Sequence, residues 1–185
     1  MPPQEKCALS GQQNDVSEQY LNPEFGAKLL AVLPMFRTFS HEELIRVYAL
    51  GDIRVYTPNA TILVEGEQSW GFYILLEGFV AVYKSGQLGL TDHRIASLGE
   101  GKAFGEMSLI DRKPRSATIV AETRVVSFYL DGDIWAKVMV DDPRTASRFY
   151  QNFSVMLSNR LRELDAEFIL SQKQLWKFAL RHNAS

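Results

Sequence analysis

Apolar residues between residues 23 and 50 recur at helical spacing and predict two short helices. The first helix starts at Pro23 and ends near Pro34, because proline removes a backbone donor. The second helix follows Ser40, which stands three residues before Glu43 in the spacing of a capping box. The apolar positions of the two helices are Leu29, Leu30, Leu33, Leu44, Val47 and Leu50.

The period of the apolar residues falls to two after Asp52, where short runs alternate with turn residues. The runs are DIRVYT, ATILVE, FYILLEG, FVAVYKSG, HRIASL, ATIVAET and RVVSFYL. About seven or eight strands of this kind, separated by glycine turns, predict a closed or sandwiched all-β unit. The fold is therefore expected to be mainly β.

The helical period returns after Leu130. The run DGDIWAKVMV predicts a short helix with an acidic cap, and Pro143 is well placed to begin a longer helix that reaches residue 178 or so. A heptad stripe follows this longer helix at alternating spacings of four and three residues: Leu157, Leu161, Leu164, Phe168, Ser171, Leu175 and Phe178. The pattern allows two interpretations, a helix packed on its own β unit or the seam of a dimer.

Composition narrows the class of protein. Residues 1–22 are rich in Pro, Gln, Ser and Asn and predict a loosely ordered leader. A net charge of −2, from 20 basic and 22 acidic residues, gives little electrostatic attraction to the phosphate backbone of nucleic acid. The single cysteine, Cys7, favours a reducing compartment, and there is neither a secretory signal nor an apolar run long enough to cross a bilayer. A cytoplasmic protein without a membrane partner is expected.

Residues 104–118, FGEMSLIDRKPRSAT, combine features that suit an anion. Gly105 lets the backbone approach a ligand closely. The residues from Glu106 to Ile110 have room for one helical turn, whose first N–H groups bind anions readily. Arg115 is the side chain type suited to bidentate phosphate contact. The stretch therefore predicts a ligand with a sugar hydroxyl for Glu106 and a phosphate for Arg115.

This stretch resembles the phosphate-binding cassette of the cyclic-nucleotide-binding domain family, with FGE, two residues, Leu, a short loop and then PR, a small residue, Ala and Thr. The resemblance implies that Glu106 accepts from the ribose 2′-hydroxyl and that Arg115 holds the exocyclic phosphate oxygen. Ser116 would add its hydroxyl, and serine at this place favours cyclic AMP over cyclic GMP. The backbone N–H groups implied around the phosphate are those of Gly105, Met107, Ser108 and Ala117.

The resemblance also implies an eight-stranded β-roll (jelly-roll) with N-terminal helices and a long C-terminal helix. Val82 and Ile95 are expected to line the base pocket of such a roll. Tyr150 and Trp176 are candidate aromatic lids over the base, and core packing is the other interpretation of both. The expected division is a leader at 1–22, N-terminal helices at 23–50, the roll at 51–130 with its cassette at 104–118, and C-terminal helices at 131–185.

The expected function is a receptor that senses a cyclic nucleotide and transmits binding to its C-terminal helices and to a partner or fused effector. A homodimer through the C-terminal helix is expected. The chain stops after LWKFALRHNAS, without room for a helix-turn-helix, so no DNA partner is expected. The alternative is a ligand-free dimerisation or docking module of the same fold, and cyclic di-GMP or another anionic nucleotide stays open as the ligand.

Enzymatic activity is not expected. His41, His93 and His182 are scattered without metal-ligand spacing, and His41 should be exposed in the first turn of its helix. The run GEGKAFGE fails as a P-loop because Ala103 follows Lys102 where Ser or Thr should stand. No catalytic residue, metal or cofactor is therefore predicted, cyclic AMP being a regulatory ligand.

Overall fold

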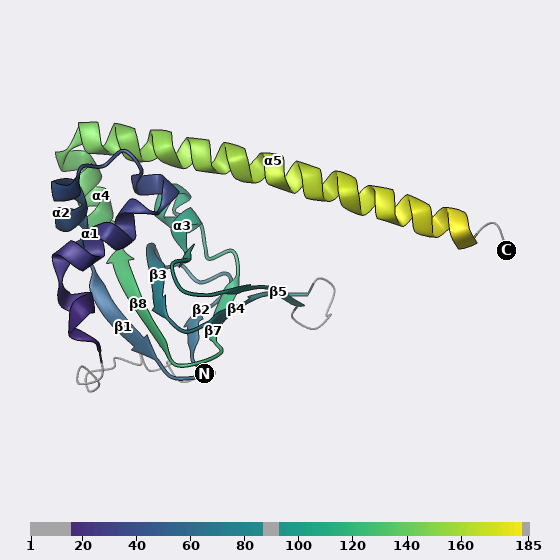
Figure 1. Cartoon of the computed structure of the whole chain (residues 1–185), viewed down its shortest axis with the longest axis horizontal. Helices are drawn as coiled ribbons and strands as arrows, with labels where there is room; N and C mark the ends of the chain where they lie inside the picture. Colours follow the sequence, from purple (N-terminus) through teal and green to yellow (C-terminus); the bar gives the residue numbers. More distant parts are fainter. Residues whose placement is uncertain (1–15, 87–92, 183–185) are drawn as a thin grey trace.

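The computed structural model describes residues 16–86 and 93–182, and Figure 1 shows their arrangement. In chain order the elements are the 3₁₀ helix η2 (Glu18–Leu21), α1 (Pro23–Ala31), the 3₁₀ helix η3 (Pro34–Phe36), α2 (His41–Tyr48), β1 (Asp52–Tyr56), β2 (Thr61–Leu63), β3 (Gly71–Glu77), β4 (Val80–Lys84), β5 (His93–Leu98), β6 (Ala103–Phe104), α3 (Glu106–Asp111), β7 (Thr118–Ala121), β8 (Val125–Asp131), α4 (Gly132–Asp141) and α5 (Pro143–His182). The predicted mainly β fold with helices at both ends is confirmed.

The strands form two four-stranded antiparallel sheets with the orders β1-β8-β3-β6 and β2-β7-β4-β5. The sheets enclose an apolar interior that includes Leu75, Phe104 and Val125. A second cluster fills the space between the β1-β8-β3-β6 sheet and the helices, and its members include Phe72 and Phe128. The eight strands of the described residues therefore form the predicted roll, with one core inside it and another beneath the helices.

The N-terminal helices form as the apolar pattern predicted. Both hydrogen bonds of the capping box are present, because the Ser40 side chain accepts from the Glu43 amide and the Glu43 side chain accepts from the Ser40 amide. Two details differ. Leu50 is 38% exposed because α2 ends earlier, and Tyr48 packs instead, with its ring 4.6 Å from that of Phe128. The predicted loose leader does not extend to residue 22, because Tyr20 is buried within η2 and its carbonyl accepts a hydrogen bond from Tyr48 Oη. Residues 1–15 of that leader lie outside the described residues.

The first turns of α5 are anchored to the N-terminal helices and to α4. The ring of Phe149 lies 5.8 Å from that of Phe36 and 4.8 Å from that of Trp135. Arg148 donates to the carboxylate of Glu43, so a charged pair joins α5 to α2 beside this aromatic cluster. These contacts fix the base of α5 on the folded domain.

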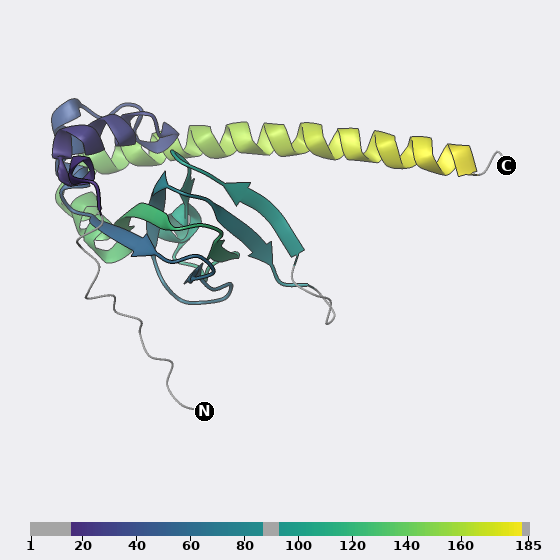
Figure 2. The same cartoon turned by 60° about the horizontal axis from the view of Figure 1, so that its bottom comes forward.

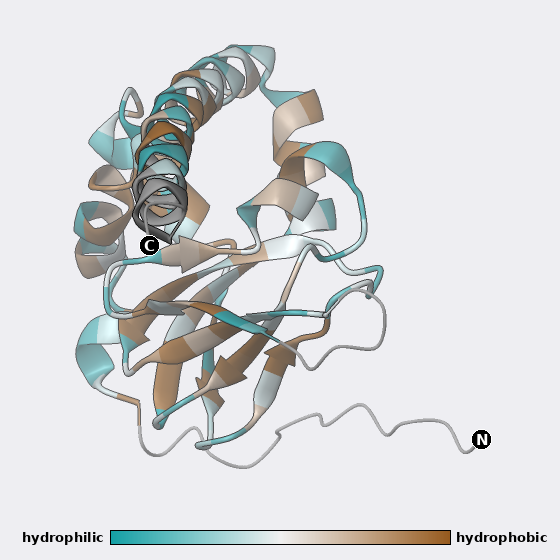
Figure 3. Cartoon of the chain, turned by 90° about the vertical axis from the view of Figure 1, so that its right-hand side faces the viewer, coloured by the Kyte–Doolittle hydropathy of each residue, from teal (hydrophilic) through white to brown (hydrophobic). Residues whose placement is uncertain are grey.

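The remainder of α5 extends past the roll, and its C-terminal turns, drawn in yellow, lie beyond the strands in both Figure 1 and Figure 2. Apolar residues continue along this extended part, where Figure 3 shows brown segments among the teal. The described side chains of the heptad stripe are Leu157 (45% exposed), Leu161 (61%), Leu164 (52%) and Phe168 (64%). Packing of this stripe on the chain's own roll is therefore wrong for these four residues.

Core packing is also wrong for the two candidate lids, because Tyr150 is 45% and Trp176 is 68% exposed. The side chains of Leu175 and Phe178 lie outside the described set. Across residues 16–86 and 93–182, no helix has both the length and the apolar character needed to cross a membrane.

Candidate functional site

The cassette starts with a glycine whose backbone no other residue adopts easily. Gly105 has a φ of 80° and caps the N-terminus of α3. A Cβ atom there would lie 2.8 Å from Arg115 Nη1 and 2.9 Å from the carbonyl oxygen of Gly71. Glycine is therefore required at position 105 both for the left-handed turn and for the close approach of the arginine.

Arg115 is the charged centre of the site and is only 4% exposed. Its Nη1 donates to the carbonyl oxygens of Gly71, at 2.8 Å, and Gly105, at 3.0 Å, and to Ser108 Oγ at 2.5 Å. Its Nε donates to Ser69 Oγ at 3.0 Å. Within the described part of the chain, Nη2 donates to no partner, so the guanidinium is anchored through Nε and Nη1 while Nη2 stays available.

Glu106 does not pair with this arginine. None of the ion pairs among residues 16–86 and 93–182 joins the two side chains. Burial raises the pKa of the Glu106 carboxyl, and the cations of Arg160 and Arg115 oppose this effect at longer range. Arg160 belongs to α5, so the helix contributes positive charge near this carboxylate. A half-buried carboxylate without an ion-pair partner among the described residues is suited to accept hydrogen bonds from a ligand.

We expect Glu106→Gln to raise thermal stability at pH 7 by roughly 2 to 4 °C, the shift that about 1 kcal/mol gives in a chain of this size. A raised carboxyl pKa means that the folded state binds a proton more readily than the unfolded state, so stability falls as the pH rises through the two values. Glutamine does not ionise and escapes this loss. Thermal unfolding of both proteins from pH 3.5 to 8 should show the difference at neutral pH and not below the ordinary glutamate pKa. A constant difference at every pH would contradict the explanation.

The other residues predicted around the anion lie on the same short helix and on the strand start that follows. No described side chain caps the first turn of α3, which leaves its amides free for an anion. Ser108 is buried and binds Arg115, whereas Met107 is 53% exposed. Ser116 is exposed, with its Oγ 3.9 Å from the sulfur of Met107, and Ala117 is half-buried. The structure therefore gathers the predicted cassette residues at one place.

The two base-pocket candidates, Val82 and Ile95, are apolar residues on the strands β4 and β5. Val82 is half-buried against the interior of the roll and pairs with Ile119 on β7. Ile95 is 59% exposed and falls where the register between β4 and β5 shifts. Packing against the roll interior accounts for an apolar residue at Val82, and Ile95 lies exposed on the edge strand β5. Their contact with a base remains a prediction.

Sequence reasoning missed the residues that hold the cassette from elsewhere in the chain. Ser69 binds Arg115 from 46 positions away, and Lys84 Nζ donates to the carbonyl oxygen of Ser116 at 2.6 Å. Lys84 also pairs with Glu65 at 2.6 Å. Serine and lysine are also ordinary surface residues, so their types alone do not indicate these contacts. The pairing of β4 with β7 brings Lys84 near Ser116, and the residues just before β3 bring Ser69 to Arg115.

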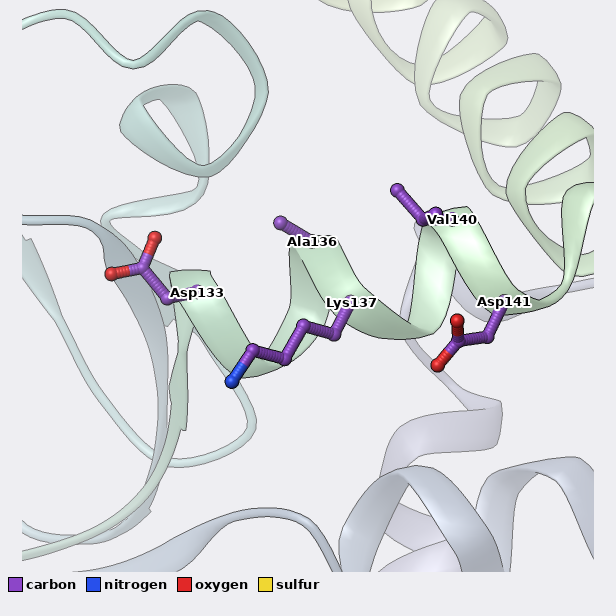
Figure 4. A pocket seen from close by; sticks show the side chains of 5 residues that line it. All are labelled: Asp133, Ala136, Lys137, Val140 and Asp141. Carbon is purple, nitrogen blue, oxygen red and sulfur yellow. The ribbon is translucent and has the colours of Figure 1, made fainter.

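A surface hollow of about 750 Å³ lies along α4 and is separate from the cassette. It is lined by Asp133, Ala136, Lys137, Val140 and Asp141, all of which project from this one helix (Figure 4). Elsewhere, no group of three or more His, Cys, Asp and Glu residues within the described ranges could hold a metal ion. The cassette around Arg115 is therefore the site with convergent polar groups.

A family model described as the cyclic nucleotide-binding domain matches residues 53–142, which include the roll, the cassette and α4. Through this segment the chain belongs to the cyclic nucleotide-binding domain family, as the cassette motif predicted. The fold agrees, because the crystal structure of the Thermus thermophilus catabolite activator protein superposes with a TM-score of 0.64 and 29% identity. The similarity covers 75% of this chain and 62% of that one.

The chain is also similar in sequence to two relatives. The chain is 30% identical over 139 residues to the cyclic AMP receptor protein of Thermus thermophilus, covering 74% of this chain and 61% of the relative. It is 31% identical over 130 residues to the cAMP-dependent protein kinase regulatory subunit of Dictyostelium discoideum, covering 69% of this chain and 39% of the relative. Because the chain spans less than two thirds of either protein, the similarity concerns the sensor domain rather than the whole relatives.

Proposed function

We propose that the chain is a cyclic nucleotide sensor that prefers cyclic AMP to cyclic GMP and transmits binding to α4 and α5. The observation that carries the proposal is the buried guanidinium of Arg115, held by four hydrogen bonds beside the uncapped first turn of α3. A cation next to free amides in a partly dry site is arranged to bind a phosphate.

The proposed roles follow from where the groups lie. Arg115 Nη2 and the amides of Met107 and Ser108 take the cyclic phosphate, since neither amide receives a side-chain cap from the described residues. The Glu106 carboxylate accepts from the ribose 2′-hydroxyl. The amides of Gly105 and Ala117 complete the surroundings of the phosphate, as the resemblance implies.

Two observations support cyclic AMP over cyclic GMP. Position 116 is a serine with an exposed hydroxyl, and the resemblance associates serine there with cyclic AMP. The two relatives described above are named for cyclic AMP. Parallel titration with cyclic AMP and cyclic GMP decides between the two bases.

We also propose that the sensor is a non-catalytic homodimer joined through α5, and that its output passes to an effector. The exposed stripe from Leu157 to Phe168 supports this, because apolar residues at heptad spacing are typical of a helix that pairs with another helix. A DNA partner remains outside the proposal.

Isothermal titration of the chain with cyclic AMP, and with cyclic GMP in parallel, tests the ligand. The protein is first unfolded and refolded to remove any ligand carried over from expression. We expect a dissociation constant in the micromolar range or tighter for cyclic AMP and weaker binding of cyclic GMP, as about 8 kcal/mol of binding free energy gives. Heat with cyclic di-GMP alone would identify another nucleotide as the ligand.

The second candidate is a ligand-free dimerisation or docking module of the same fold. The exposed stripe of α5 favours it, since the stripe serves a dimer whether or not the cassette binds anything. This module predicts no heat with any cyclic nucleotide and an unchanged melting temperature. Its Glu106 and Arg115 would not form a structural ion pair, because Arg115 is bound to Gly71, Gly105, Ser69 and Ser108 instead.

A further inference from the structure

Tyr129 lies near the end of β8, between the cassette and the first turn of α4. Its hydroxyl oxygen is 3.1 Å from the carbonyl oxygen of Trp70 and 3.1 Å from Asp131 Oδ2, and it is positioned to donate to either. A phenolic hydroxyl has one proton, so it can donate to only one of these acceptors at a time. Burial raises the pKa of the Tyr129 hydroxyl, which keeps that proton in place at neutral pH. The hydroxyl therefore has two alternative hydrogen bonds.

One of the two acceptors belongs to the segment that Arg115 holds. Trp70 stands between Ser69, whose Oγ accepts from Arg115 Nε, and Gly71, whose carbonyl oxygen accepts from Arg115 Nη1. Arg115 thus binds the residues on both sides of the Trp70 carbonyl. A shift of the guanidinium toward an anion would displace this carbonyl relative to Tyr129.

The other acceptor caps α4. Oδ1 of Asp131 accepts from the amides of Asp133, at 2.9 Å, and Ile134, at 3.2 Å. The start of the helix also rests on the same tryptophan, since a Cβ atom at Gly132 would lie 2.7 Å from Trp70 Cβ. The orientation of the Asp131 carboxylate therefore bears on the first turn of α4, which leads directly into α5.

We propose that the Tyr129 hydroxyl couples anion capture at Arg115 to the first turn of α4, by moving its one hydrogen bond between the Trp70 carbonyl and the Asp131 carboxylate. The inference rests on the proposed function, which supplies the anion. A ligand shifts such an element only if it binds one arrangement better than the other, and displacement of the Trp70 carbonyl provides that difference. Tyr129 is a positioning residue here and does not touch the ligand.

Two other connections run in parallel and have to be separated in the test. The amide of Gly132, the first residue of α4, donates directly to the Trp70 carbonyl oxygen at 3.3 Å. This bond is kept in Tyr129→Phe, so a response carried by it would persist in that variant. Arg112, the C-cap of α3, pairs with Asp133 Oδ1 at 3.0 Å. Both side chains are about half exposed or more, at 49% and 63%, so solvent screens this pair and it should couple weakly. Arg112→Ala is therefore expected to preserve the response that Tyr129→Phe removes.

The test compares amide hydrogen exchange at Asp133 and Ile134 in the full chain, with and without saturating cyclic AMP, and measures the dissociation constant of each sample by calorimetry. Tyr129→Phe removes the hydroxyl and keeps the ring, which packs 4.7 Å from Tyr73 and beneath the Arg54 guanidinium at 3.4 Å. Tyr73→Phe is the matched control, a buried tyrosine on the neighbouring strand whose hydroxyl accepts from Arg54.

In the wild type and in Tyr73→Phe, we expect cyclic AMP to change the two exchange rates by at least about fivefold, the lower range of allosteric coupling. Tyr129→Phe should bind with a dissociation constant within about threefold of the wild type and change the rates by less than about twofold. Asp131→Asn, which keeps a good N-cap and replaces the carboxylate, should lose the response in the same way and serves if Tyr129→Phe fails to fold.

An equal response in Tyr129→Phe and the wild type would overturn the coupling role and leave the proposed function standing. A wild type that binds no cyclic nucleotide would overturn the proposed function, and the coupling role with it. Loss of the response in Tyr73→Phe as well would assign the effect to general packing and also overturn the role.

Discussion

Replacing Arg115 by alanine is expected to weaken cyclic AMP binding by about 2 to 5 kcal/mol, or roughly 30- to 4,000-fold, as for the loss of a buried charged partner. The side chain is 4% exposed and aligned by Ser69, Gly71, Gly105 and Ser108, so its loss leaves the site without its oriented guanidinium. Titration calorimetry of the variant against the wild type measures the loss. An unchanged dissociation constant would contradict the role given to Arg115.

The same substitution also removes four hydrogen bonds, so folding must be measured separately. The carbonyl of Gly71 would lose a charged donor in a buried place, and thermal stability should fall. Arg115→Lys provides the control, because it keeps the charge but not the planar fork that reaches both Ser69 and Gly71. It should bind more tightly than Arg115→Ala and less tightly than the wild type. Equal affinities for the two variants would show that geometry, not charge, decides.

Lysines at Leu161 and Leu164 together are expected to convert a dimer into monomers. These side chains are 61% and 52% exposed and belong to the stripe on α5, where each lysine would place an unpaired charge in an apolar seam. Breaking a buried contact in this way costs several kcal/mol, typically about 3 to 5. Light scattering coupled to size exclusion gives the mass of each species directly.

The control for this variant carries the same added charge on another face of the same helix. Asn159→Lys with Ala166→Lys adds two lysines at exposed positions outside the stripe. It should leave the mass of the dimer unchanged. A dimer that persists in Leu161→Lys with Leu164→Lys would mean that α5 is not the seam.

The helices and strands were predictable wherever the apolar residues kept a regular period along the chain. The capping box at Ser40, the cap at Asp131 and the proline at the start of α5 each act locally, so the letters alone indicate where a helix begins. The errors arose where tertiary contact decides. Tyr20 sits in a polar stretch and is nevertheless buried, and Leu50 lies two residues beyond the end of its helix. The heptad stripe could not reveal its own exposure, because the same spacing serves a core and a seam.

The sequence indicated which residues form the cassette, but not all of the hydrogen bonds that hold them. The motif around Gly105 and Arg115 is local in sequence, and α3 forms where one helical turn was expected. Two partners of Arg115, Gly105 and Ser108, lie within the motif, but the other two, Ser69 and Gly71, lie more than forty positions earlier, and no motif indicates them. Long-range hydrogen bonds of this kind depend on strand register, which the sequence leaves open.

The length of α5 makes it a lever arm. Its 40 residues span about 60 Å, and the aromatic contacts of Phe149 fix only the first turns. A tilt of about 5° at this pivot would carry the far end through roughly 5 Å, because displacement grows in proportion to distance from the pivot. A small rotation of α4, directly before the pivot, is thereby magnified into a movement that another protein chain could distinguish by contact.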